Sequence, residues 1–147
     1  MSKDRNTVPA SRKWRVEDIF PSIEAWEETY AACEAEINFS DFEGKLIDVE
    51  TVLACMTRLN AVVLKLSHLA VYAHMRHDED SRNSEYMALT AKFSMLGMKL
   101  GEATAFITPE LTALPVETLE AFAADPRLAD YDYTIRCLIK SKLIRDL

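Results

Sequence analysis

One long segment of this chain, free of helix breakers, constrains the fold more than any other feature. Residues 49–74 contain neither glycine nor proline. Their apolar residues recur at intervals of three and four: Val52, Met56, Leu59, Val63, Leu66 and Ala70. This interval places them on one face of an α-helix, and Leu53, Val62 and Leu69 widen that face. We therefore predict a long, central, largely buried helix.

A second helix is predicted before this one. Ser22 is a candidate N-cap, and glutamates follow it near the positive end of the helix dipole. The predicted helix ends near Ile37 and buries an apolar stripe at the same interval: Ile23, Trp26, Tyr30, Cys33 and Ile37. Gly44, which tolerates positive φ, then breaks the pattern, and Asp48 is a candidate N-cap for the central helix.

A third long helix, at residues 84–106, is expected to pair with the central one. It places apolar residues on one face: Leu89, Phe93, Leu96, Leu100 and Ala103. We expect Met87, Met95 and Met98 beside that face to belong to the core as well, although methionines at this spacing also suit an adaptable peptide groove. The polar run 77–84 is predicted to be the tight connection of an antiparallel hairpin.

Prolines divide the remaining sequence into shorter helices. Pro115 begins a predicted short helix that reaches Ala124, Asp125 and Pro126 stop it, and a last helix is expected at residues 128–143. We predict an all-α fold, an antiparallel helical bundle of about five helices with a long central helix pair. Residues 1–13 are expected to form a flexible tail, and residues 14–147 a single helical domain.

Charge and hydropathy exclude several classes of partner. The net charge is -7, and no lysine or arginine cluster could neutralise a phosphate backbone, so nucleic acid is not an expected partner. The N-terminus has no signal-peptide pattern and no apolar run is long enough for a membrane span, so we expect a cytoplasmic protein without a membrane partner. Cys33, Cys55 and Cys137 are interpreted as reduced core thiols.

The strongest candidate for a metal site is a group of histidines. His68, His74 and His77 precede Asp78 and Asp80, and residues three apart share a helix face. No HExxH motif or cysteine-histidine cluster accompanies them. The preferred interpretation is that His74 and His77 are solvated residues near a helix C-terminus and that His68 lies between core positions. We therefore predict no metal site in this chain.

Other catalytic patterns are missing from the sequence. No serine lies in a GxSxG motif, and Gly44, Gly97 and Gly101 are too dispersed for a phosphate loop. Gly97 and Gly101 form a GxxxG pair that would let another helix approach closely, which is a faint signal of dimerisation. We predict no catalytic and no cofactor-binding residue.

Several segments, taken in order, resemble oligoendopeptidase F. Residues 14–22 read Trp-Arg-Val-Glu-Asp-Ile-Phe-Pro-Ser and are followed by Trp26. The aromatic-x-Gly-Lys-Leu turn at residues 42–46, Tyr72-Ala73 with the acidic run at residues 78–80, and Phe-Ile-Thr-Pro-Glu-Leu at residues 106–111 come next. The similarity covers about residues 14–140.

The resemblance implies a function that this chain does not complete. It implies the N-terminal helical domain of a zinc metallopeptidase, which walls a cavity where short peptides are cleaved and packs on a catalytic domain. The family's HExxH helix and glutamate ligand match no position here, so zinc is expected only in the full-length enzyme and this chain is expected to be inactive alone. The residues that follow Lys142 depart from the family pattern, and the resemblance implies a chain that stops before the catalytic domain.

Two further expectations follow. Apolar surface meant for the catalytic domain would be left exposed, which favours a homo-oligomer. The alternative function is an autonomous helical module that binds a partner helix or peptide and has no catalytic activity.

Overall fold

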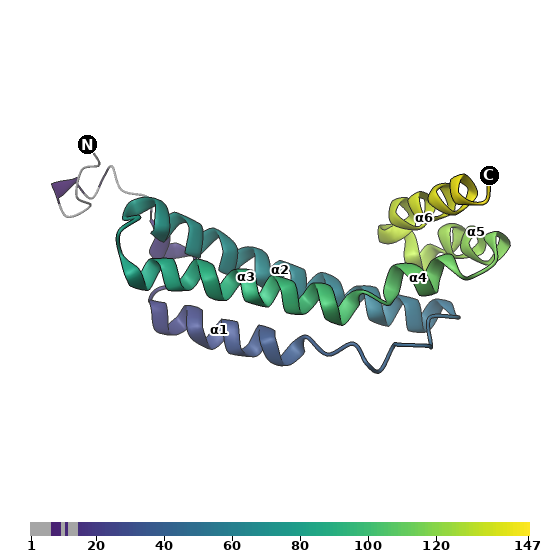
Figure 1. The fold of residues 1–147 in the computed structure, drawn as a ribbon, viewed down its shortest axis with the longest axis horizontal. Helices are drawn as coiled ribbons and strands as arrows, with labels where there is room; N and C mark the ends of the chain where they lie inside the picture. The colour runs from purple at the N-terminus through teal and green to yellow at the C-terminus, as the bar shows by residue number, and fades with distance from the viewer. Residues whose placement is uncertain (1–6, 10, 12–14) are drawn as a thin grey trace. The chain divides into compact units, whose positions relative to one another are not determined.

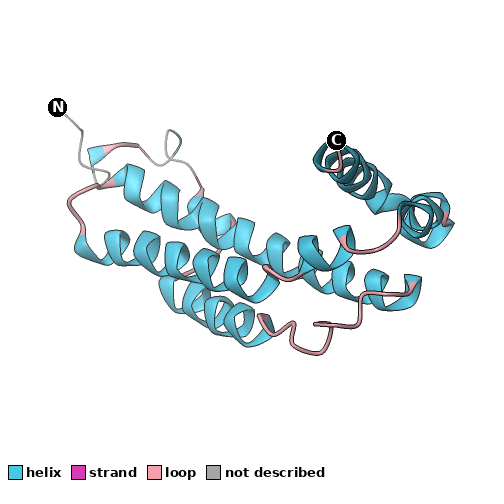
Figure 2. Ribbon diagram, turned by 45° about the vertical axis from the view of Figure 1, so that its right-hand side comes forward, coloured by secondary structure: helices cyan, strands magenta, loops and turns pink. Residues whose placement is uncertain are grey.

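The computed structural model describes residues 7–9, 11 and 15–147, and within these ranges it contains helices and turns but no strand (Figure 2). The all-α prediction is therefore confirmed. The predicted tail, residues 1–13, lies largely outside the described residues. The described chain divides into two compact units. The first comprises the described residues up to Ile37 together with Val62–Leu100, and the second Asn38–Ala61 and Gly101–Leu147. The single domain predicted for residues 14–147 stays a prediction.

Three helices build the first unit: α1 (Ile23–Glu36), the later part of α2 (Val49–Glu79), and α3 (Ser84–Thr104) as far as Leu100. Ser22 caps α1 as predicted, because its side-chain oxygen accepts a hydrogen bond of 3.1 Å from the backbone N–H of Ala25. Figures 1 and 2 show α1 beside an antiparallel pair formed by α2 and α3. The buried residues of this unit are mainly large and apolar: Val16, Phe20, Trp26, Cys33, Ile37, Val62, Leu69, Tyr72, Ala73, Leu89, Leu96 and Leu100.

Two details of the predicted hairpin were wrong. The central helix does not end near His74 but continues to Glu79, so the connection is only residues 80–83. The last turn of α2 contains Arg76 and His77, whose hydrogen-bond donors suit the negative end of the dipole. The predicted apolar stripe is also displaced, since Val63 is 41% exposed while Val62 is fully buried. One residue turns a helix by about 100°, and α1 packs on the face that contains Val62 and Leu69.

The second unit holds the start of α2 and four short helical elements. Helix α4 (Ile107–Thr112) leads to α5 (Val116–Ala124), then to a 3-10 helix, η4 (Pro126–Tyr131), and to α6 (Asp132–Arg145). The third predicted helix was too long, because α3 ends at Thr104 and α4 is separate. The last predicted helix began too early, because η4 precedes it. The core of this unit is apolar: Phe39, Phe42, Leu46, Val52, Cys55, Met56, Ile107, Leu111, Leu119, Phe122, Leu128 and Ile135.

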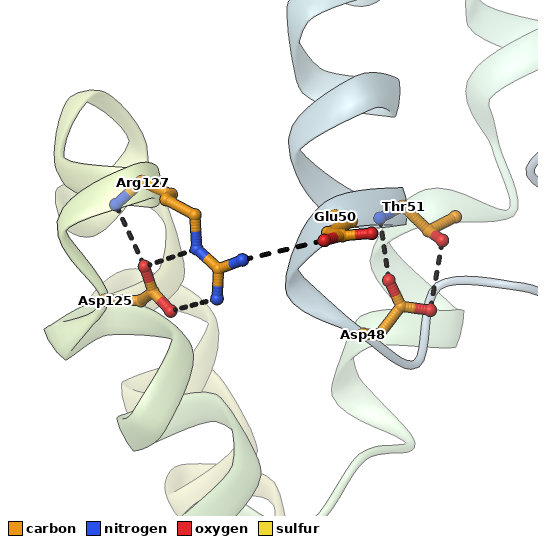
Figure 3. A network of polar contacts seen from close by, with 5 residues as sticks. All are labelled: Asp48, Glu50, Thr51, Asp125 and Arg127. Carbon is orange, nitrogen blue, oxygen red and sulfur yellow. Dashed lines mark hydrogen bonds and ion pairs between the residues drawn. The ribbon is translucent and has the colours of Figure 1, made fainter.

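A polar network holds the start of α2 in the second unit (Figure 3). Asp48 caps α2 as predicted, accepting from the Thr51 backbone N–H at 2.8 Å and from the Thr51 hydroxyl at 3.1 Å. Asp125 caps η4 in a similar way, accepting from the backbone N–H of Arg127 at 2.9 Å. The Arg127 guanidinium also binds the Asp125 carboxylate and lies 4.0 Å from Glu50 Oε1. Both caps use a short acidic side chain immediately before the helix, as the sequence pattern predicts.

Candidate functional site

The three histidines considered for metal binding lie on α2 but do not converge. His68 and His77 are nine residues apart, which on an α-helix places them on opposite sides and about 13 Å apart along the axis. His74 is exposed and makes an edge-to-face contact with the Phe93 ring at 5.8 Å. Within the described ranges, no group of three His, Cys, Asp or Glu side chains could hold a metal ion. These described residues therefore do not fit a zinc site.

A cluster of side chains surrounds Arg76, near the C-terminal end of α2. The Arg76 side chain is only 12% exposed, and its Nη1 atom donates to Glu79 Oε2 at 3.0 Å. Its guanidinium lies 5.3 Å from the centre of the Tyr72 ring and 5.7 Å from that of Tyr86, distances typical of cation–π contacts. Nη2 also lies 3.5 Å from Glu17, in the 3-10 turn η3 (Val16–Asp18). The cluster fastens η3 and α3 to α2, which is a structural role.

Two of the segments that carry the family resemblance meet in this cluster. The Phe20 ring, from the segment before α1, packs edge-on against Tyr72 with the ring centres 5.5 Å apart. The Trp26 indole N–H donates to the Leu69 carbonyl at 3.0 Å within the core. Aromatic residues in these segments are therefore required by packing of the first unit.

The other two such segments meet in the second unit, through Glu110. Its Oε2 accepts a hydrogen bond of 2.9 Å from the Gly44 backbone N–H, and its Oε1 accepts one of 3.0 Å from the Leu46 backbone N–H. Gly44 adopts a φ of 78°, in the region that favours glycine. One carboxylate thus accepts hydrogen bonds from two backbone N–H groups of the turn at residues 42–46. We call this arrangement the Glu110 clasp; no sequence pattern had indicated it.

Charged residues of the first unit join α1 to the hairpin. Lys92 and Lys99 of α3 pair with Glu27 and Glu34 of α1, the latter pair at 3.0 Å, and Lys65 of α2 pairs with Glu36. In both α1 and α3 the paired residues are seven apart, which is the spacing expected for two parallel helices in contact. These pairs are partly exposed, so each contributes about 0.2–1 kcal/mol at most.

Several apolar side chains that were expected in the core lie on the surface. Met87, Met95 and Met98 of α3 are 51%, 66% and 69% exposed, so the prediction that they are core residues was wrong. Their positions on α3 turn away from the Leu89, Leu96 and Leu100 face.

Cys33 and Cys55 are buried thiols as predicted, but Cys137 is exposed on α6, which corrects the third assignment. None of the helices in the described part of the chain combines the length and apolar character needed to cross a membrane.

Comparison with known proteins shows which proteins this chain is similar to. No family model matches the chain. The chain is 36% identical to oligopeptidase PepF of Bacillus subtilis over 142 residues, which is 95% of this chain and 21% of PepF. It is 30% identical to the chromosomal oligoendopeptidase F of Lactococcus lactis subsp. cremoris over 147 residues, 97% of this chain and 24% of that protein.

Over nearly its whole length the chain is therefore similar to part of proteins named oligoendopeptidase F or PepF. The resemblance drawn from the sequence motifs is therefore confirmed. Part of the crystal structure of a putative peptidase from Chlamydophila abortus has the same fold as this chain, with a TM-score of 0.85 and 23% identity. The match covers 95% of this chain and 24% of that one. The chain thus spans 21–24% of the length of these relatives.

Proposed function

We propose that this chain is the N-terminal, non-catalytic part of an oligoendopeptidase F-like zinc metallopeptidase. In this role it packs on a catalytic domain and forms one wall of the cavity in which short peptides are hydrolysed. The match to PepF, which runs over 95% of this chain but 21% of PepF, carries the proposal. The zinc and the catalytic residues belong to the other part of the enzyme, since the sequence contains no HExxH motif.

The geometry of the chain supports a structural contribution. The Arg76 guanidinium joins helices, because it pairs with Glu79 and lies over the rings of Tyr72 and Tyr86. In the Glu110 clasp, the Glu110 carboxylate accepts hydrogen bonds from backbone N–H groups of the turn at residues 42–46. Both arrangements use charged side chains to stiffen a helical scaffold, as expected of a wall that must hold its shape. A cytoplasmic location and a homo-oligomer of the isolated chain stay predictions from the sequence.

The first experiment measures zinc content and cleavage of a quenched-fluorescent peptide for the purified chain, with and without added zinc. The proposal expects no bound zinc and no cleavage. Stoichiometric zinc with chelator-sensitive cleavage by this chain alone would contradict it and would return attention to His68, His74 and His77.

A second experiment tests the contribution to the whole enzyme. A chimera of Bacillus subtilis PepF carries this chain in place of its matching 142 residues, and a deletion variant lacks them. The proposal expects chelator-sensitive cleavage by the chimera and little or none by the deletion variant. If the deletion variant cleaved the peptide as fast as an active chimera, the result would favour the alternative, an autonomous helical interaction module.

A further inference from the structure

Between Met87 and Met98 one face of α3 lacks the charges that a solvent-facing helix normally carries, and the next charge on that side is the exposed Glu102. Between Glu85 and Leu100 the only charged residues of α3 are Lys92 and Lys99, and both pair with glutamates of α1. The other exposed positions from Met87 to Met98 are uncharged: Met87, Ala88, Ala91, Ser94, Met95 and Met98. Met87, Ala91, Ser94 and Met98 recur at intervals of four, three and four, and Met95 lies beside them; we call these five residues the α3 methionine face.

The composition of this face suits burial. A helix that remains in water usually presents charged and polar residues on its outer side, whereas a helix that is apolar all round is covered by protein. The remaining polar groups at the face are already satisfied, since the Ser94 hydroxyl donates to the Thr90 carbonyl at 3.0 Å and the Thr90 hydroxyl to the Met87 carbonyl at 2.8 Å. Covering the face would therefore leave no hydroxyl without a partner.

Helix α1 has the opposite character. It carries five glutamates and no basic residue, and two of these glutamates, Glu24 and Glu28, are exposed. The exposed side of α1 therefore carries negative charge, while the α3 methionine face presents thioethers and small side chains. Flexible methionine side chains adapt to the shape of an opposing surface, which makes them common at protein interfaces. This asymmetry distinguishes a face to be covered from a face to remain in solvent.

We propose that the α3 methionine face docks on the part of the oligoendopeptidase F-like enzyme that lies outside this chain, through a surface with few or no charges. This inference rests on the proposed function and adds to it which helix makes the contact. The length of the relatives supports the choice of occupant, since 76–79% of each lies outside the matched region by subtraction from the 21–24% that is matched. Helix α1 stays exposed to solvent in the same enzyme.

Thiol labelling in the PepF chimera tests this assignment separately from activity. In a Cys137→Ser background, which removes the exposed thiol, one variant carries Met98→Cys and a matched control carries Ala31→Cys on the exposed side of α1. The isolated chain should label at similar rates at both positions. In the chimera, labelling of Met98→Cys should slow by about tenfold or more, because a covered thiol reacts only when the contact opens. Ala31→Cys should label as it does in the isolated chain.

Each outcome has a distinct meaning. Fast labelling of Met98→Cys in an active chimera would overturn the docking face and leave the proposed function standing. Slow labelling of Ala31→Cys instead would assign the contact to α1. Protection of Met98→Cys in the isolated chain that grows with protein concentration, together with a dimer in ultracentrifugation, would assign the face to a second copy.

A smaller graft keeps the test decisive if the full chimera does not fold. Only residues 84–104 of this chain replace the matching helix of PepF, with the same Met98→Cys reporter. The proposal expects a folded, active enzyme with a protected thiol. The surface of PepF that covers its own matching helix would then cover the α3 methionine face of the graft. Loss of activity on this graft, or a freely labelled thiol within it, would contradict the proposal.

Discussion

The indole N–H of Trp26 donates a hydrogen bond to the carbonyl oxygen of Leu69 at 3.0 Å, and both residues are fully buried. Trp26→Phe removes the donor and part of the ring volume, so we expect a loss of about 2–4 kcal/mol in the free energy of unfolding. Urea denaturation followed by circular dichroism measures it. Tyr30→Phe is the control, because Tyr30 stacks on Trp26 but is only partly buried. A larger loss in the control would contradict this account of Trp26.

The Glu110 clasp should contribute measurably to stability. Glu110→Ala leaves the N–H groups of Gly44 and Leu46 without their carboxylate acceptor, so we expect a loss of about 1–3 kcal/mol in unfolding free energy. Glu110→Gln keeps a single acceptor oxygen and should lose less. Glu120→Ala, an exposed glutamate of α5, is the matched control. Equal losses for Glu110→Ala and Glu120→Ala in urea titrations would show that the clasp contributes nothing.

Two glycine-to-alanine substitutions should change stability in opposite directions. A Cβ at Gly44 would meet no atom within 4 Å, but its φ of +78° is unfavourable for alanine, so Gly44→Ala should cost about 1 kcal/mol. Gly97 lies inside α3 with the same open space, so Gly97→Ala should stabilise by about 0.5–1 kcal/mol through helix propensity. Thermal unfolding of the two variants compares them directly. The same sign for both would refute the conformational argument.

Acid should weaken the cap of α2. Hydrogen bonds from the Thr51 backbone N–H and from the Thr51 hydroxyl lower the pKa of Asp48 below its ordinary value. Because the folded-state pKa is depressed, this stabilisation is present above the unfolded pKa of about 3.9 and is lost as pH falls through the lower folded value. Asp48→Asn should therefore flatten the decline of melting temperature below about pH 4. Asp130→Asn changes the net charge equally. In this control the difference in melting temperature between neutral and acid pH should stay closer to that of the parent chain.

The three thiols should differ in reactivity. Burial raises the pKa of Cys33 and of Cys55, which disfavours the nucleophilic thiolate, whereas Cys137 is exposed. Ellman's reagent should therefore modify one thiol rapidly in the folded chain and all three in denaturant. Cys137→Ser should abolish the rapid phase. A rapid phase of two thiols would show that one of the buried cysteines is accessible.

Local patterns allowed the sequence to predict much of the fold. The interval of apolar residues located α1, α2 and α3, and short polar side chains at Ser22 and Asp48 marked two helix starts correctly. The same patterns could not show where α2 ends, since residues 77–79 are acceptable both in a helix and in a turn. Nor could they choose between Val62 and Val63 as the buried neighbour, because that depends on where α1 packs.

The candidate functional features were harder to predict. The Glu110 clasp joins a side chain to backbone N–H groups that lie 66 and 64 residues away, and backbone donors have no sequence signature. The family resemblance found both segments but not their contact. Methionines at helical spacing predict an apolar stripe equally well for a core and for a surface awaiting a partner, so the exposure of Met95 and Met98 required the structure.

The groups that fasten α1 have a consequence for how the chain acquires its structure during synthesis. The Leu69 carbonyl that receives the Trp26 N–H is made 43 residues later, and the lysines that pair with Glu27 and Glu34 follow after 65 residues. When α1 leaves the ribosome, its glutamates therefore have no lysine partners and its apolar stripe has no cover. The first unit can complete its packing only after α3 has emerged. Until then α1, the first of its α-helices to be made, stays open to chaperones and proteases.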